Sequence, residues 1–230
     1  MENTTTTERV RGHFHEILTS PDWVVALLRD LNGSAWTTGI ESDKKQRGSA
    51  INTSLYSYDA GRQLAVVQVR QCIFHPRRFS QVRKDYYLIG RIEDGSPFAH
   101  PIEFRAAGRA VGPDLAAGVR LALTRIWDCD EDDLGEIVRN GDVAFVPVRR
   151  IPDGAAMVAE NHIVIRESHH VQGLAGGEIW GDGETYYVRG RAKIEHAKYE
   201  HPTARVRMGV WRVQAGIRAT GWGFTRPVGD

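Results

Sequence analysis

Histidines are concentrated in one part of this 230-residue chain. Five of the nine fall within residues 162–201, and His196 and His201 stand in the segment IEHAKYEHPT. Histidine changes its charge near neutral pH, so two histidines and a nearby cation can supply the base, the acid and the phosphate contact that cleave RNA at a ribose 2′-hydroxyl. This inventory predicts a metal-independent endoribonuclease site with the candidate catalytic residues His170, His196, His201, Lys198 and Tyr199.

The same region offers an alternative chemistry, metal binding. Imidazoles from neighbouring strands suit zinc or iron, and glutamates are available as carboxylate partners. Within residues 162–201 there is no HxH, and the chain has no HExxH, so the spacing matches no sharp metal motif. We therefore expect no cofactor. The alternative is zinc or iron in a cupin-like β-barrel that acts on a small molecule, with the ligands His169, His170, His196 and His201.

A third interpretation is structural. In YYVRGRAKIEH, strand alternation places His196 on the same face as the apolar residues Val188 and Ile194. A histidine on such a face is often a hydrogen-bonded core residue. The protein would then be a non-catalytic interaction module.

Basic residues cluster in two segments that contain aromatic residues. Residues 62–91 carry seven Lys or Arg against one acid, and residues 189–212 carry seven against two. Basic strands with aromatic side chains bind phosphates and stack on bases, so we expect RNA or single-stranded nucleic acid as the partner; the alternative is an ordinary solvated strand face. The candidate nucleic-acid-binding residues are Arg77, Arg78, Arg83, Lys84, Tyr87, Arg189, Arg191 and Lys193.

Composition and motifs argue against several classes of function. The net charge of only +1 does not by itself indicate a nucleic-acid or membrane partner. The two cysteines stand in unrelated contexts, which argues against a disulfide framework and a CxxC metal site, and the absence of GxSxG and GxxxxGK[ST] argues against a serine hydrolase and a P-loop protein. No run approaches the roughly 20 apolar residues of a membrane span. These features predict a cytoplasmic protein with no membrane partner. A protein partner and the oligomeric state stay open.

The elements that would position these residues are mostly strands. Residues 20–33 predict a helix, because Ser20 can cap it, Pro21 suits its first turn and Asn32-Gly33 ends it. Residues 114–138 predict a helical connector, and Asp182-Gly183 predicts a hairpin turn. Strands are expected at 63–71, 86–92, 98–104, 143–151, 162–167 and 204–213, and on both sides of the turn within 178–195.

These elements predict an α+β, mostly β fold with two small β modules, an N-terminal helix and a central helical segment. The expected division is a flexible tail at 1–19, an α+β module at 20–113, the connector at 114–138 and a β module with the histidine cluster at 139–230. An echo of YYLIGR (86–91) in YYVRGR (186–191), each followed by His-Pro, suggests internal duplication as one origin of the modules; a barrel or sandwich is the other architecture considered.

The last part of the chain resembles a known sequence pattern. The segments RNGDVAFVPVRRIP, ESHHV, EHPT and GVWRV occur in that order within residues 139–213. They resemble an uncharacterised group of bacterial proteins with an RxGDVxxVPV opening, a GHxH-like segment, a HEEHP-like segment and a GxYxV ending. The resemblance implies that His170, His201 and His196 match the group's histidine positions, and it brings no assigned activity. Here SHH stands in place of HxH, and HAKYEH is two residues longer than HEEH.

Overall fold

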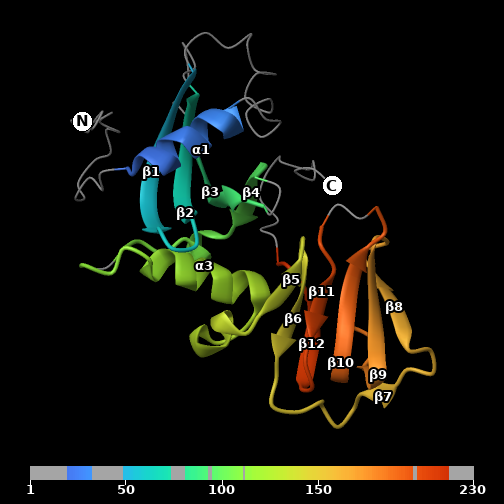
Figure 1. Ribbon diagram of the computed structural model, residues 1–230. Helices are drawn as coiled ribbons and strands as arrows, with labels where there is room; N and C mark the ends of the chain where they lie inside the picture. Colours follow the sequence, from blue (N-terminus) through green and yellow to red (C-terminus); the bar gives the residue numbers. More distant parts are fainter. Residues whose placement is uncertain are drawn as a thin grey trace, which may run out of the picture. The chain divides into compact units, whose positions relative to one another are not determined.

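The fold is α+β and mostly β, as the sequence predicts. The computed structural model describes residues 20–32, 49–73, 81–92, 95–110, 112–198 and 201–217. Two sheets and two helices make up the described part of the chain (Figure 1), and the chain divides into two compact units, the second of which covers residues 123–217. Neither helix in the described ranges has the length and hydrophobicity of a membrane-spanning segment. An internal duplication is not shown, because the echoed segments lie in sheets of four and eight strands.

The first unit is an antiparallel sheet with a helix against one face. Helix α1 (Asp22–Asn32) begins after Pro21, whose carbonyl accepts hydrogen bonds from the backbone of Val24 and Val25. Its apolar side packs on alternate residues of the central strands, which confirms the predicted helix. The four strands lie in chain order: β1 (Ser49–Asp59), β2 (Leu64–Ile73), β3 (Gln81–Arg91) and β4 (Pro97–Ile102).

The predicted connector is only partly helical. It contains α3 (Ala117–Trp127) and the short 3-10 helix η2 (Glu131–Gly135), and strand β5 already begins at Val138. Ser57 of β1, fully buried, holds the start of α3, because its hydroxyl donates to the Leu115 carbonyl and accepts from the Val119 amide. The boundary between the compact units falls at Leu123, inside α3 and within the segment 114–138 that was predicted to connect the two modules.

The second unit is built on one eight-stranded antiparallel sheet. The order is β5-β6-β12-β10-β9-β7, with β11 paired to β10 and β8 paired to β9. The segment 204–213 was predicted as one strand, but it holds β11 and the start of β12, and both pair with β10. The bounds are β5 (Val138–Asn140), β6 (Val143–Pro147), β7 (Ala156–Met157), β8 (His162–Ile165), β9 (His169–Gly181), β10 (Tyr186–His196), β11 (Ala204–Val206) and β12 (Val210–Ala215).

The predicted hairpin at Asp182-Gly183 is confirmed. It joins β9 to β10, and Gly181 pairs with Tyr186 across it. The Asp182 carboxylate accepts hydrogen bonds from the backbone amides of Glu184 and Thr185, and Gly183 takes a φ of +96°, which suits glycine. This turn sets the register of the two longest strands of the unit.

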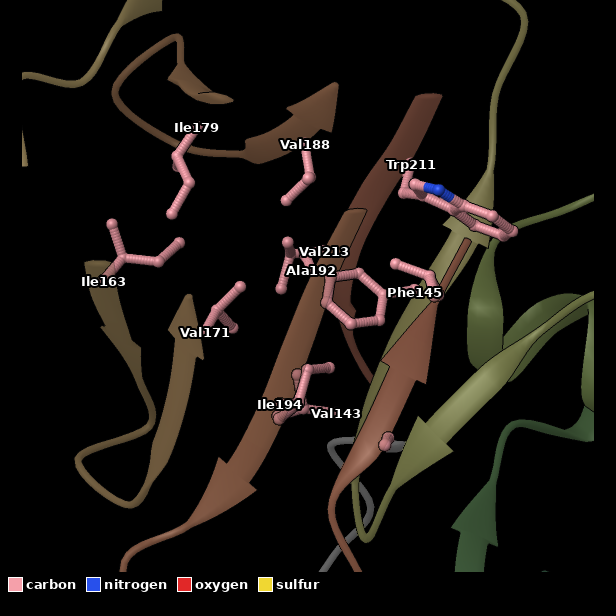
Figure 2. Close-up of a cluster of buried hydrophobic side chains, with 12 residues drawn as sticks. Val143, Phe145, Ile163, Val171, Ile179, Val188, Ala192, Ile194, Trp211 and Val213 are labelled. Atoms are coloured by element: carbon pink, nitrogen blue, oxygen red, sulfur yellow. The ribbon is translucent and has the colours of Figure 1, made fainter. Parts of the chain in front are cut away.

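The core of the second unit lies on one side of its sheet. Figure 2 shows Ile163 and Val171 on one side and Phe145 on the other, with side chains that point toward a shared interior. Trp211 belongs to the same buried cluster. On β10 the inward residues are buried, and the residues between them are exposed or half-buried. The two faces of β10 therefore carry different chemistry: an apolar core that ends in a histidine, and an outward row of charges.

Candidate functional site

Three histidines meet at the end of the core where β9 begins and β10 ends. His169 pairs directly with His196 in the strand register, and both side chains are only 2% exposed. Their ring centroids lie 4.8 Å apart in an edge-to-face contact, and the His201 ring lies 5.8 Å from that of His196. The predicted placement of His196 on the core face is confirmed.

A tight turn between β5 and β6 closes this histidine cluster (His169, His196 and His201). Gly141 takes a φ of +59°, and a Cβ atom there would come within 2.7 Å of His201 Nε2 and 3.3 Å of His169 Nε2. The neighbouring Asn140, 1% exposed, donates from its side chain to the Pro202 carbonyl at 2.7 Å. Only glycine fits at position 141 without moving the rings.

Charged and polar groups complete the surroundings of the cluster. Asp142 Oδ1 lies 3.6 Å from His169 Nε2, and the Arg166 guanidinium binds the same carboxylate and donates to the Gly216 carbonyl. Arg166 and Glu167 both take positive φ values, +49° and +63°, which are unfavourable for residues with a Cβ. The Arg166 contacts hold this turn in place.

A backbone amide and a side-chain hydroxyl hold two of the histidine rings. The Lys198 amide donates to His196 Nδ1 at 3.3 Å, which puts the hydrogen of a neutral ring on Nε2. Ser168 Oγ lies 3.1 Å from His169 Nδ1, and the Ala197 amide donates to the Ser168 carbonyl at 2.7 Å. The rings are thus packed and oriented as expected for histidines that are hydrogen-bonded residues of the core.

The structure groups the histidines differently from the sequence analysis. His170, expected beside His196 and His201, lies on the outward face and stacks on His162, with Nδ1 2.9 Å from His162 Nε2. His169 takes the expected place of His170 in the cluster. Of the cluster, only His201 is more than slightly exposed, and Lys198, whose amide donates to His196, is exposed. Tyr199 lies outside the described residues.

The metal alternative finds no matching geometry in the part of the chain that the structure describes. Within those residues, no three His, Cys, Asp or Glu side chains are placed to hold a metal ion. The four histidines proposed as zinc or iron ligands are divided between the core cluster and the outward pair with His162.

The predicted nucleic-acid residues of the second unit share one face. Arg189 and Arg191 are exposed and Lys193 is half-buried, on the side of β10 that faces away from the core. Arg205 of β11, which the sequence analysis did not single out, lies directly opposite Lys193 and is exposed. We call these four residues the outer cationic row: Arg189, Arg191, Lys193 and Arg205.

Two carboxylates lie against the outer cationic row. Glu195 accepts a hydrogen bond from Lys193 at 2.8 Å, and Glu178 lies 3.6 Å from Arg189. The hydrogen bond from Lys193, with the charge of Arg205 nearby, holds the pKa of Glu195 below its usual value. Among the described residues, no acidic side chain pairs with Arg191.

The predicted residues of the first unit are more scattered. Lys84 is exposed on β3. Tyr87 is 3% exposed within the core under α1, so its ring cannot stack on a base as expected. Arg77, Arg78 and the side chain of Arg83 lie outside the described residues.

Comparisons with known proteins found no relative of this chain. No protein-family model, no curated protein and no solved structure matches the chain.

Proposed function

We propose that the second unit binds single-stranded nucleic acid along the outer cationic row. The observation that carries the proposal is the placement of four cations on one exposed face of two paired strands. Arg191 and Lys193 are alternate residues of β10, about 6.8 Å apart, and Arg189 precedes them across the irregularity at Gly190 (φ +109°), so the three form a row along the strand. A line of cations suits a polyanion better than a single small anion.

The electrostatics of the free protein support this proposal. Lys193 and Arg205 face each other directly in the antiparallel ladder, and like charges in that position are destabilising. Glu195 offsets part of the repulsion, but the row keeps four cations against two carboxylates. A phosphate backbone would relieve the remaining repulsion and release counterions as it binds.

One planar group also lies on this face. The Arg189 guanidinium lies over the Trp180 indole ring, 5.0 Å from its centroid, and Arg189 is exposed. Arginine planes stack on nucleic-acid bases as aromatic rings do, which favours a single strand with accessible bases over a duplex.

The proposal concerns binding. His169 and His196 are 2% exposed, so a scissile phosphate has no access to their rings as they are packed. The proposal therefore does not include cleavage by these histidines, and the cluster has a structural role.

The test is salt-dependent binding of a fluorescent single-stranded RNA of about 12 nucleotides, followed by anisotropy. Replacing Arg189 and Arg191 together by Gln should weaken binding about tenfold or more and make the salt dependence less steep. The matched control replaces Arg149 and Arg150 by Gln, because these exposed arginines of the same unit lie outside the row and the charge loss is equal. Equal affinity of both double variants, at an unchanged melting temperature, would refute the proposal.

A further inference from the structure

A second candidate binding face lies in the first unit, on the side of its sheet that faces away from α1. Val67 and Val69 of β2 pack beneath the helix, so the alternate residues Gln68 and Arg70 point to the other side. On β3, Tyr87 packs beneath the helix, and its alternate neighbours Lys84 and Tyr86 share the side of Gln68 and Arg70. Gln68 and Tyr86 are buried, so the accessible end of this side carries the two cations, half-buried Arg70 and exposed Lys84.

The two cations face each other without a compensating charge. Arg70 and Lys84 are directly opposite in the ladder, where like charges are unfavourable. Within the part of the chain that the structure describes, neither forms an ion pair. In addition, Arg70 Nε is buried and has no hydrogen-bond partner. An anion bound here would accept a hydrogen bond from this buried N–H and compensate the charge of the second cation.

A hydrogen-bond network joins Gln68 and Tyr86, which lie next to Arg70 and Lys84 along the two strands. The Gln68 amide nitrogen donates to the hydroxyls of Tyr56 and Tyr86, each at 2.7 Å. Burial, followed by the adjacent Tyr56 hydroxyl, raises the pKa of Tyr86, so its hydroxyl keeps its hydrogen at neutral pH. This network fixes the Tyr86 ring beside the cation pair.

An exposed aromatic ring completes the face. Phe104, in the 3-10 helix η1 (Phe104–Ala106), is 70% exposed, and its ring centroid lies 5.5 Å from that of Tyr86. Ile102 pairs with Tyr86 in the antiparallel register, so the chain that follows β4 runs toward the level of Lys84. A large apolar ring is thus exposed beside Tyr86, which lies two residues along β3 from Lys84. An exposed aromatic ring is a stacking surface for a planar group.

We propose that this face binds a nucleoside phosphate, with the phosphate on Arg70 and Lys84 and the base stacked on Phe104. The ligand is either a free nucleotide or one nucleotide of a single strand, because the recognising chemistry is the same. The site uses no residue of the outer cationic row, so it does not depend on the function proposed for the second unit.

The test is calorimetric titration of the full chain with adenosine monophosphate, adenosine and inorganic phosphate. Adenosine monophosphate should bind with one site, and each half of the ligand alone should bind about tenfold more weakly. Replacing Arg70 and Lys84 by Gln should abolish binding. Phe104→Ala should weaken binding of adenosine monophosphate about tenfold and leave inorganic phosphate unchanged.

Controls separate this site from the outer cationic row. Arg62→Gln removes an exposed cation of the same unit, and the Arg189→Gln, Arg191→Gln protein lacks the outer row; both should bind adenosine monophosphate as the unchanged protein does. Melting temperatures show whether each variant folds.

RNA binding distinguishes the two sources of the ligand. If the ligand is a free nucleotide, the Arg70→Gln, Lys84→Gln protein should lose binding of adenosine monophosphate and keep its affinity for RNA. A nucleotide within a strand predicts that this variant and Phe104→Ala both weaken RNA binding. Unchanged binding of both ligands by these folded variants would overturn the inference, whatever the outer row does.

Discussion

Each unit of this protein places two cations directly opposite each other in an antiparallel ladder, but their surroundings differ. In the second unit, Glu195 hydrogen-bonds Lys193 opposite Arg205, and further arginines continue the row along β10. In the first unit, Arg70 and Lys84 stand without an ion pair among the described residues, next to buried tyrosines and an exposed Phe104 ring.

The difference indicates two kinds of anion recognition. A long, partly neutralised row makes many weak contacts to a polymer, and its affinity then depends strongly on salt. A compact cation pair with an unsatisfied donor and an adjacent ring favours one phosphate and one planar group. Local surroundings, more than the charge pair itself, distinguish the two faces.

The largest predicted effect concerns the inner face of β10, where the histidine cluster has a structural role. Gly141→Ala adds a Cβ at positive φ, 2.7 Å from His201 Nε2. We expect a loss of about 2–4 kcal/mol in the free energy of unfolding, measured with urea, from backbone strain and displacement of the rings.

The matched control is Gly154→Ala, because a Cβ at that position meets nothing within 4 Å and the backbone conformation is ordinary. It should change stability by less than about 0.5 kcal/mol. If the two variants unfold at the same urea concentration, the histidine cluster does not contribute to the fold as described.

A smaller effect, with different outcomes in the two units, comes from removing one cation of each pair. Arg70→Met relieves a like-charge contact and removes a buried unsatisfied N–H, so it should stabilise the first unit by about 1 kcal/mol. Lys193→Met relieves repulsion but also breaks a partly exposed ion pair, so its effect should stay within about 0.5 kcal/mol. Thermal unfolding of both variants measures this difference, and equal shifts would show that the surroundings of the two pairs do not matter.

The smallest predicted effect concerns pH. The pKa of Glu195 is held below its usual value, chiefly by the hydrogen bond from Lys193. A carboxylate with a lowered pKa stabilises the fold above its unfolded pKa, near 4.5, and this contribution is lost as the pH falls through the lower folded value. The difference in melting temperature between the unchanged protein and Glu195→Gln should therefore be constant above about pH 5.5 and shrink below about pH 4. A difference that instead grows on acidification would contradict the assignment.

Local sequence signals predicted the regular parts of the fold. Capping and turn residues gave α1 and the hairpin at Asp182-Gly183, and alternation along β10 placed His196 inward and Arg191 outward. Strand β1 was missed, because its many serines and its asparagine disguise the alternation. The break after Val206 was also missed, because its single glycine, Gly209, stands between two runs that alternate as one strand would.

The candidate site was harder to predict, because it depends on register and on contacts distant in sequence. A shift of one residue exchanges the faces of His169 and His170, and the turn at Arg166 and Glu167, with positive φ at residues other than glycine, hides that register. Asp142 and Gly141 reach the histidines through pairing of β6 with β12, which no local pattern reveals. Tyr87 was assigned to the wrong face because both residues of the Tyr86-Tyr87 pair suit a stacking role, and only the position of α1 decides between them.

The most direct measurement of the central claim compares two single substitutions on the outward face of β10. Arg191→Gln removes a positive charge and Glu195→Gln removes a negative one, and both replace a side chain by a neutral amide on the same row. In anisotropy titrations with single-stranded RNA at low salt, the account predicts that Arg191→Gln weakens binding severalfold and that Glu195→Gln strengthens it. Two variants that bind RNA as the unchanged protein does, or that both change in the same direction, would contradict it.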